Sequence, residues 1–481
     1  MLDFFKTHPI LMKVINLLLK IFSSCGSMPT QLHFLFYSLG LLCLNSGKSV
    51  RSIFAHCLSL MVGFSLTSYY YAFKGSKVDI DAWTCSLIKL GLSIIPEGCT
   101  LPVLFAIDDT LVEKVGKFYE GWGKLHDHAA HNGTNYLNGH CFVCLAMLVP
   151  VLGKDGFTYI RLPVAYRMWI PESRTGKQPK TSQPKDKNAK RQFINNSTRE
   201  FKTKLQIAND LLELAYQQIP EDRSLGVLGD SWYPKGEVIK FVKRHKRIAC
   251  LFAVPKDTVL CDLPSEPTGK RGRPRLWGKR LNLDESFEFS NIEGAKYLVA
   301  TRKVLTKLFG HDTVVTAYVT KTKDGNSCRL YLCYNPEQCI LPRSCFTDTS
   351  WLAIYDSAPE MRAFCLYSLR WNIETTFFEQ KAHWGFGDYM LRWATAIERL
   401  VNVQAIVYSM LSILPYTDSK MKNLQELSIQ ERRFEVGRLI DRQRFLGSYI
   451  QKLETDENKK PLAEAFRELA REDGFSLKSA S

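Results

Sequence analysis

The chain has few of the features that mark disulfide-stabilised or zinc-binding proteins. It contains 14 cysteines in 481 residues, but they are scattered without the spacing of a disulfide framework. Cys141 and Cys144 form a CxxC motif inside an apolar segment, and no second CxxC pair completes the ligands of a structural zinc site. We therefore expect reduced, mostly buried thiols in a cytoplasmic protein.

Signals for export or membrane insertion are also scarce. The N-terminus lacks a signal-peptide pattern with a small-residue cleavage site. Residues 53–73 and the segment VNVQAIVYSMLSIL after Leu400 are long and apolar, but polar residues such as His56, Asn402 and Gln404 interrupt them. Both segments therefore predict buried helices instead of transmembrane spans. No internal repeat is detectable.

Acidic residues are too few to balance the basic ones, and the formal net charge is +16. The excess lies in three patches: residues 174–204 carry a net charge of +8, residues 270–280 carry +6, and residues 235–247 carry +5. The rest of the chain is slightly acidic. Basic charge gathered in patches on a neutral body indicates a polyanionic partner.

The order of apolar segments predicts an α/β fold. Residues 1–95 show helical periodicity, and the next candidates are the strands Val103–Ile107, Cys141–Leu152 and Phe157–Val164, the amphipathic helix Arg199–Gln217 and the strand Ser224–Gly229. Three strands, a helix and a further strand begin a ribonuclease-H-like core.

Segments rich in β-branched residues and tyrosine interrupt this core. They are the strand candidates Tyr297–Val304, Asp312–Thr320 and Cys328–Tyr334. The expected organisation is therefore a helical N-terminal region that contacts DNA ends, a first part of the core, a β-rich insertion, a second part of the core and a charged helical C-terminal region, over residues 1–95, 96–255, 256–345, 346–415 and 416–481.

The segment YSLRWNIETTFFEQK predicts a helix with a chemically distinct face. Tyr367, Arg370, Glu374 and Lys381 stand at offsets of three, seven and fourteen residues. At about 100° per residue they fall within roughly 60° of one another. An exposed Arg-Glu pair on an ordinary amphipathic helix is the alternative interpretation.

Two aspartates follow apolar runs that predict neighbouring strands. Asp108 follows Val103–Ile107, and Asp230 follows the run that ends at Gly229, so we expect both at strand ends beside a cleft. With Glu374 they would form a three-carboxylate cluster, which repels itself unless a cation is bound. Hard oxygen ligands suit Mg²⁺ or Mn²⁺, and two such ions about 3.5–4 Å apart support phosphodiester cleavage.

The segments VLFAIDDT, VLGDSWY and YSLRWNIETTFFEQK resemble the three motifs of DDE insertion-sequence transposases. More narrowly, they resemble the group that has a Y-R-E-K signature and a β-strand insertion before the glutamate. The resemblance spans roughly residues 100–415. It implies a ribonuclease-H-like core, with Asp108, Asp230 and Glu374 as catalytic metal ligands and Tyr367, Arg370 and Lys381 as DNA-backbone contacts.

The resemblance also implies cut-and-paste transposition. A 3′-hydroxyl freed at the element end would attack target DNA, with two Mg²⁺ ions (or Mn²⁺) as cofactors and no small-molecule cofactor. The implied partners are terminal inverted repeats and target DNA, held by a homodimer in the bacterial cytoplasm on the nucleoid, without a membrane. Whether the excised ends pass through a hairpin stays open.

Asp109 competes with Asp108 for the first carboxylate position. Adjacent strand residues point to opposite faces, so only one of the two can face the metal site. The D-x-T pattern of the resembled family favours Asp108 with Thr110.

Other residues give weaker indications of DNA contact. The tetrapeptide GRPR, which includes Arg273 and Arg275, resembles the core of a minor-groove AT-hook, but a basic loop that contacts phosphates without sequence preference is the favoured interpretation of so short a match. Trp277 and Trp232 are candidates for base stacking or for packing. Lys202 and Lys204, with the loop Arg174–Lys190, form a predicted phosphate track. Four histidines (His126, His128, His131 and His140) predict loop residues near a nucleic-acid cleft instead of a zinc site.

Two other functions fit parts of the sequence. A catalytically silent DNA-binding protein derived from a transposase would use only the basic patches. A ribonuclease-H-like nuclease would use the carboxylates but leaves the Tyr-Arg-Lys stripe unexplained.

Overall fold

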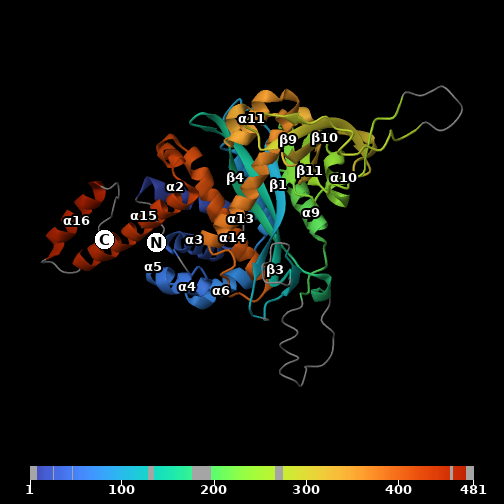
Figure 1. Ribbon diagram of the computed structural model, residues 1–481. Coiled ribbons are helices and arrows are strands. Elements are labelled where there is room, and N and C mark those ends of the chain that lie inside the picture. The colour runs from blue at the N-terminus through green and yellow to red at the C-terminus, as the bar shows by residue number, and fades with distance from the viewer. Residues whose placement is uncertain are drawn as a thin grey trace, which may run out of the picture.

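The computed structural model describes residues 8–24, 26–45, 47–116, 118–127, 135–175, 197–265, 275–454 and 459–472. One extended mixed sheet lies at its centre, and helices from both ends of the chain gather on one side (Figure 1). Arg273, His128 and His131 lie outside the described residues, as does most of the loop Arg174–Lys190.

The N-terminal region is helical. Its elements are α2 (Pro9–Phe22), α3 (Met28–Cys43), α4 (Val50–Ile53), a π-helical turn (Phe54–Leu58), α5 (Ser59–Met61), α6 (Leu66–Lys74) and α7 (Ile80–Leu92). The side chains of Ser49, Ser65 and Asp79 accept hydrogen bonds from backbone N–H groups in the first turns of α4, α6 and α7. Residues 53–73 are not one buried helix as predicted, because the chain breaks after Met61 and begins α6 only at Leu66.

The sheet has 11 strands. These are β1 (Val103–Glu113), β2 (Gly123–His126), β3 (Tyr136–Gly153), β4 (Gly156–Trp169), β5 (Leu225–Gly229), β6 (Ile248–Val254), β7 (Leu260–Cys261), β8 (Ser290–Asn291), β9 (Tyr297–Thr306), β10 (Gly310–Thr322) and β11 (Cys328–Tyr334). Strands β1, β5 and β6 are parallel to one another. Strand β3 is antiparallel to both of its neighbours, β1 and β4. The resulting order β4-β3-β1-β5-β6 is that of a ribonuclease-H-like core.

The strands that follow β6 do not form a separate sheet. Strand β11 pairs antiparallel with β6, β10 pairs with β11, and β9 pairs with β10. The residues predicted as a β-rich insertion therefore extend the core sheet past its β6 edge, where an unpaired strand would otherwise expose its backbone polar groups.

Helices cover the core strands on both faces (Figure 1). Helices α9 (Lys204–Tyr216) and α10 (Gly236–Arg244) lie on one face, and α13 (Trp371–His383) and α14 (Ala394–Ile413) lie on the other. Thr203 and Gln206 form a capping box at the start of α9. The remaining helices are α11 (Thr349–Ser357), α12 (Arg362–Cys365), α15 (Ile429–Glu454) and α16 (Lys460–Glu472), with short 3₁₀ segments at Glu172–Arg174, Pro336–Cys339, Arg343–Cys345, Pro359–Met361, Leu366–Arg370, Leu414–Tyr416 and Ser419–Glu426.

Helix α14 forms the centre of the α-helical layer. Within the described ranges, the segment Ala394–Tyr416 is long and apolar enough to cross a membrane, but its most apolar 18-residue window is entirely buried inside the protein. Asn402 shows why polar residues occur in it: its side-chain oxygen accepts a hydrogen bond from the backbone N–H of Tyr166 at 3.0 Å, and its amide donates to the Tyr166 carbonyl at 2.9 Å.

Candidate active site

The first two carboxylates are brought together by strand register. Ile107 on β1 is paired with Gly229 on β5, so Asp108 and Asp230 are the next residues on two neighbouring parallel strands. The prediction that Asp108 closes its strand was wrong, because β1 continues to Glu113. Beyond Ile107, β1 pairs with β3, and the pairing with β5 has ended. Asp108 therefore lies where the parallel pairing opens.

Asp108 and Asp109 face opposite sides of the sheet. Asp108 accepts a hydrogen bond from Arg370 of the α13 side, at 3.2 Å from Nη1 to Oδ2. Asp109 instead forms an ion pair with Lys204 of α9 at 2.7 Å and accepts a hydrogen bond from the Tyr233 hydroxyl at 3.1 Å. Asp108 is thus the aspartate beside the helix that carries Glu374.

The Tyr-Arg-Glu-Lys segment is helical along its whole length. Its first part, Leu366–Arg370, is a 3₁₀ helix, and α13 continues it from Trp371. The Arg370 guanidinium contacts Asp108 and also the Glu374 carboxylate, one turn further along. Arg370 is 7% exposed. The guanidinium therefore links two of the predicted metal ligands.

Burial and mutual repulsion favour protonation of the two aspartates. Burial and repulsion from Asp230 together raise the pKa of Asp108 to about 7, against the opposing charge of Arg370. Burial also raises the pKa of Asp230, against hydrogen bonding from the backbone N–H of Trp232. A bound cation would relieve this repulsion.

The donor chemistry fits a divalent cation, although the side chains do not form a ready-made cage. Among the described residues, no group of three or more His, Cys, Asp or Glu side chains is arranged to hold a metal ion. Asp108 and Asp230 supply hard oxygen donors side by side, and Glu374 is connected to Asp108 through Arg370. The Arg370 guanidinium supplies the positive charge between the two carboxylates.

Tyr367 and Arg370 border a pocket of about 540 Å³. Tyr367 is 6% exposed, and its ring packs 4.7 Å from the ring of Tyr331. Burial raises the pKa of the Tyr367 hydroxyl. Other lining residues combine positive charge with aromatic surface: Lys296, Arg329, Trp351 and Trp371. Lys381, further along α13, is exposed.

The basic patches differ in how much of their charge is free. In residues 235–247, Lys243 pairs with Asp312 at 3.0 Å, Arg244 pairs with Glu213 at 2.6 Å, and Arg247 donates to backbone carbonyls. Part of the positive charge of this patch is therefore balanced within the protein, while Lys235 and Lys246 are exposed. Arg275 is exposed.

Lys202 and Lys204, two residues of the predicted phosphate track, both form ion pairs within the protein. Lys202 pairs with Asp210 at 2.7 Å. Lys204 pairs with Asp109 on the far face from Glu374, and its side chain is 21% exposed. Sequence periodicity gave no signal for either pairing, because Lys202 precedes helix α9 and Asp109 lies 95 positions before Lys204 on a strand.

His140 was wrongly predicted as a loop residue. It lies on β3, fully buried, with one ring nitrogen 2.8 Å from the Tyr389 hydroxyl and the other 3.0 Å from the Glu120 carbonyl. His126 ends strand β2. His126 and His140 are close in the sequence, but the fold places their side chains in different environments.

The two tryptophan candidates differ in exposure. Trp232 follows Asp230 closely and is 51% exposed, with the Lys235 amine 4.5 Å from its ring centroid. Trp277 is half-buried, and its ring lies 6.2 Å from that of His311. Trp232 therefore has a free surface beside the carboxylates, whereas Trp277 contributes partly to packing.

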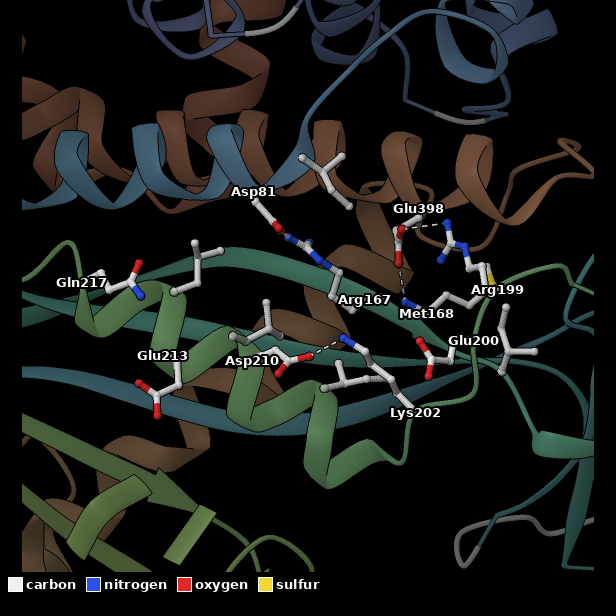
Figure 2. A pocket seen from close by; sticks show the side chains of 15 residues that line it. Asp81, Arg167, Met168, Arg199, Glu200, Lys202, Asp210, Glu213, Gln217 and Glu398 are labelled. Atoms are coloured by element: carbon white, nitrogen blue, oxygen red, sulfur yellow. Dashed lines mark hydrogen bonds and ion pairs between the residues drawn. The ribbon is translucent and has the colours of Figure 1, made fainter. Parts of the chain in front are cut away.

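Another pocket lies away from the predicted metal ligands. It has a volume of about 670 Å³ and is bordered by β4, α7, α9 and α14 (Figure 2). Figure 2 shows that its charges face one another: Lys202 reaches Asp210, and Arg199 reaches Glu398 at 3.0 Å. This pocket contains none of the three predicted metal ligands.

A ribonuclease-H-like sheet with paired aspartates at its parallel centre and a carboxylate-bearing helix beside them defines a nuclease-type fold. The family model described as DDE superfamily endonuclease matches residues 22–306. The chain therefore belongs to the DDE superfamily endonucleases. The matched region contains Asp108 and Asp230 and ends before Glu374. No curated protein matches the sequence significantly.

Proposed function

We propose that the protein is a cut-and-paste DNA transposase of the group with the Y-R-E-K signature. It cleaves the ends of an insertion sequence and joins them to target DNA in the cytoplasm. The observation that supports this proposal is the Arg370 guanidinium, which contacts both Asp108 and Glu374, beside the neighbouring parallel strand that Asp230 follows. Membership of the DDE superfamily endonucleases supports DNA as the substrate.

In the proposed mechanism, Asp108, Asp230 and Glu374 would hold two Mg²⁺ ions. The bound ions would activate the attacking oxygen and neutralise charge on the scissile phosphate. Arg370 turns from the carboxylates to the phosphate when DNA binds, since one guanidinium cannot fully satisfy both. Tyr367 and Lys381 hold the backbone near the cleaved end, and the two ends are paired by a homodimer.

Asp230→Asn is the direct test. The probe is a supercoiled plasmid that carries the reading frame with its flanking genomic DNA, incubated with Mg²⁺. We expect the wild type to nick at the element ends, and the variant to lose at least about 10³-fold in nicking rate while its DNA affinity stays unchanged. Nicking by Asp230→Asn at the wild-type rate would remove this residue from the mechanism.

The same assay separates the alternative functions. A silent DNA-binding protein would retain the plasmid without nicking it in any divalent cation. A ribonuclease-H-like nuclease would degrade RNA or unrelated DNA as readily as the element ends. Cleavage confined to the element ends, followed by joining to a second DNA, supports the transposase.

A further inference from the structure

The carboxyl end of helix α13 has an unusual set of hydrogen-bond donors. The last carbonyl groups of a helix have no partners inside the helix and need donors from elsewhere. Helix α13 ends at His383, and Gly385 follows with a left-handed backbone (φ +69°). The carbonyls of His383 and Trp384 therefore need donors from outside the helix, whereas the Gly385 carbonyl already accepts a hydrogen bond from the backbone N–H of Asp388 at 2.9 Å.

Buried side chains from three different elements supply these donors. Lys48 donates through Nζ to the His383 carbonyl, and Arg433 donates to the same oxygen at 2.8 Å. Gln404 of α14 donates to the carbonyls of Trp384 and Gly385 at 3.3 and 3.1 Å. Lys48 is 2% exposed and Arg433 is 0% exposed. Two buried cations thus converge on one carbonyl oxygen.

Lys48 and the glycine after α13 are fitted to each other. A Cβ atom at Gly385 would lie 2.6 Å from Lys48 Cβ and 3.2 Å from Lys48 Cδ. Only glycine therefore leaves room for the Lys48 side chain at this position, in addition to allowing the left-handed turn.

The two cations come from opposite ends of the chain. Lys48 lies between α3 and α4, and Arg433 lies on α15. Arg433 also donates to the Leu44 carbonyl and to the Asn45 side chain, the latter at 3.1 Å, so it ties α15 to the end of α3. The backbones of α15 and α3 approach closely, because a Cβ atom at Gly437 would lie 2.6 Å from the Leu42 carbonyl oxygen.

Ending a helix with two buried cations requires free energy to remove their charges from water. Buried cations are normally paired with carboxylates, and here both point at carbonyl oxygens. Burial and the charge of Arg433 lower the pKa of Lys48 to about 7, and Asp388 only partly offsets this. A glycine turn with a solvent-exposed carbonyl would end α13 at less expense.

We propose that Lys48 and Arg433 are positioning residues for Glu374. They fix the carboxyl end of α13 to the N-terminal and C-terminal helical regions, so these two regions set where Glu374 lies relative to Asp108 and Asp230. At 1.5 Å per residue, Glu374 is about 14 Å along the helix axis from the clamped carbonyl of His383. This inference rests on the proposed function, because it assigns Glu374 a part in cleavage.

The experiment compares Lys48→Met and Arg433→Met with the control Arg432→Met. Arg432 is the neighbour of Arg433, is 9% exposed, and donates to the carbonyls of Leu424 and Leu411, away from α13. We expect both clamp variants to nick the plasmid about 10²-fold more slowly at unchanged DNA affinity, since small misplacements of catalytic groups carry losses of this size. The control should fall by less than about threefold at a comparable loss of thermal stability.

Hydrogen exchange gives a readout that does not depend on activity. In Lys48→Met, the backbone amides in the last turn of α13 should exchange about tenfold faster than in wild type, and in Arg432→Met they should not change. Arg433→Lys keeps the charge and should recover part of the nicking rate, which protects the test if Arg433→Met does not fold.

The outcomes separate this inference from the proposed function. A wild type that fails to nick overturns the proposed function, while faster exchange at the end of α13 would still support the clamp. Folded Lys48→Met protein with wild-type nicking and wild-type exchange overturns the clamp and leaves the transposase proposal standing. An equal loss of nicking in Arg432→Met would assign the effect to general destabilisation and also overturn it.

Discussion

Arg370 donates a hydrogen bond to Asp108, which lies 262 positions earlier in the chain, at 3.2 Å. The same guanidinium contacts Glu374. One cation therefore holds together two of the carboxylates proposed as metal ligands, and it offsets part of their repulsion when no metal is bound. Five predictions follow from this site and its surroundings, beyond the tests given above.

Without divalent cations, ionisation of Asp108 should lower the stability of the folded protein as the pH rises from about 4 to 7. The pKa of Asp108 is about 7 in the folded protein against 3.8 as its ordinary value, so its carboxyl binds more protons in the folded state in this window. Integrated over the window, the contribution of Asp108 amounts to at most about 4 kcal/mol. The difference in urea unfolding between wild type and Asp108→Asn at several pH values isolates this contribution from those of other groups.

Added Mg²⁺ should stabilise the wild type more at pH 8 than at pH 5, because only the ionised carboxylates bind it. The comparison uses the shift in the urea midpoint on adding Mg²⁺ at each pH. An equal shift at both pH values would contradict a metal site that contains Asp108.

Asp108→Asn and Asp109→Asn should have opposite patterns of effect. Asp108→Asn should reduce nicking by at least about 10³-fold with little loss of stability. Asp109→Asn breaks the pair with Lys204, so it should reduce the free energy of unfolding by about 1–3 kcal/mol and nicking by less than tenfold. Nicking rates and urea unfolding of the two variants check this, and a reversed pattern would assign the metal site to Asp109.

Lys381→Ala should weaken DNA binding and make it less sensitive to salt. Loss of one phosphate contact lowers the slope of log affinity against log salt concentration by about 0.9. Fluorescence anisotropy with labelled element-end DNA at several salt concentrations measures the slope. Lys240→Ala is the matched control, since Lys240 is exposed but pairs with Glu237. The same slope in both variants would make Lys381 an ordinary surface lysine.

His140 should make the protein sensitive to acid. Burial lowers the pKa of this histidine from 6.5 to about 4, so the folded state binds fewer protons than the unfolded state between these values. Stability conferred by the neutral ring is complete above about pH 6.5 and declines as the pH falls toward 4, by about 3 kcal/mol in total. The difference in urea unfolding between wild type and His140→Gln measures it. Replacing the exposed His56 should leave the profile unchanged.

The core strands could be predicted from the sequence because each is a short apolar run that ends in turn residues. The predicted strand Ser224–Gly229 corresponds to β5, which begins one residue later, at Leu225. The predicted strand Cys328–Tyr334 has the same bounds as β11. Strand β1 extends six residues past the predicted end, to Glu113. Its polar half is held by pairing with β3, which is a long-range interaction that local composition does not encode.

The side-chain pairings of the candidate site were less accessible to sequence reasoning. Helical spacing placed Arg370 one turn from Glu374, and the structure has this contact. Helical spacing could not predict the ion pair between Lys204 and Asp109. The two residues lie on different elements, and periodicity within one element does not indicate which elements face each other. Lys48 and Arg433 gave no signal at all, since neither belongs to a motif that predicts a buried contact.

The pairing of β6 with β11 has a mechanical consequence. A domain joined to its neighbour only by loops can rotate as a rigid body about those loops. Strands that share main-chain hydrogen bonds with the core sheet can move only together with that sheet. Any widening that admits a DNA duplex beside β5 must therefore come from the segments outside the sheet, and a crosslink between β6 and β11 should leave cleavage intact.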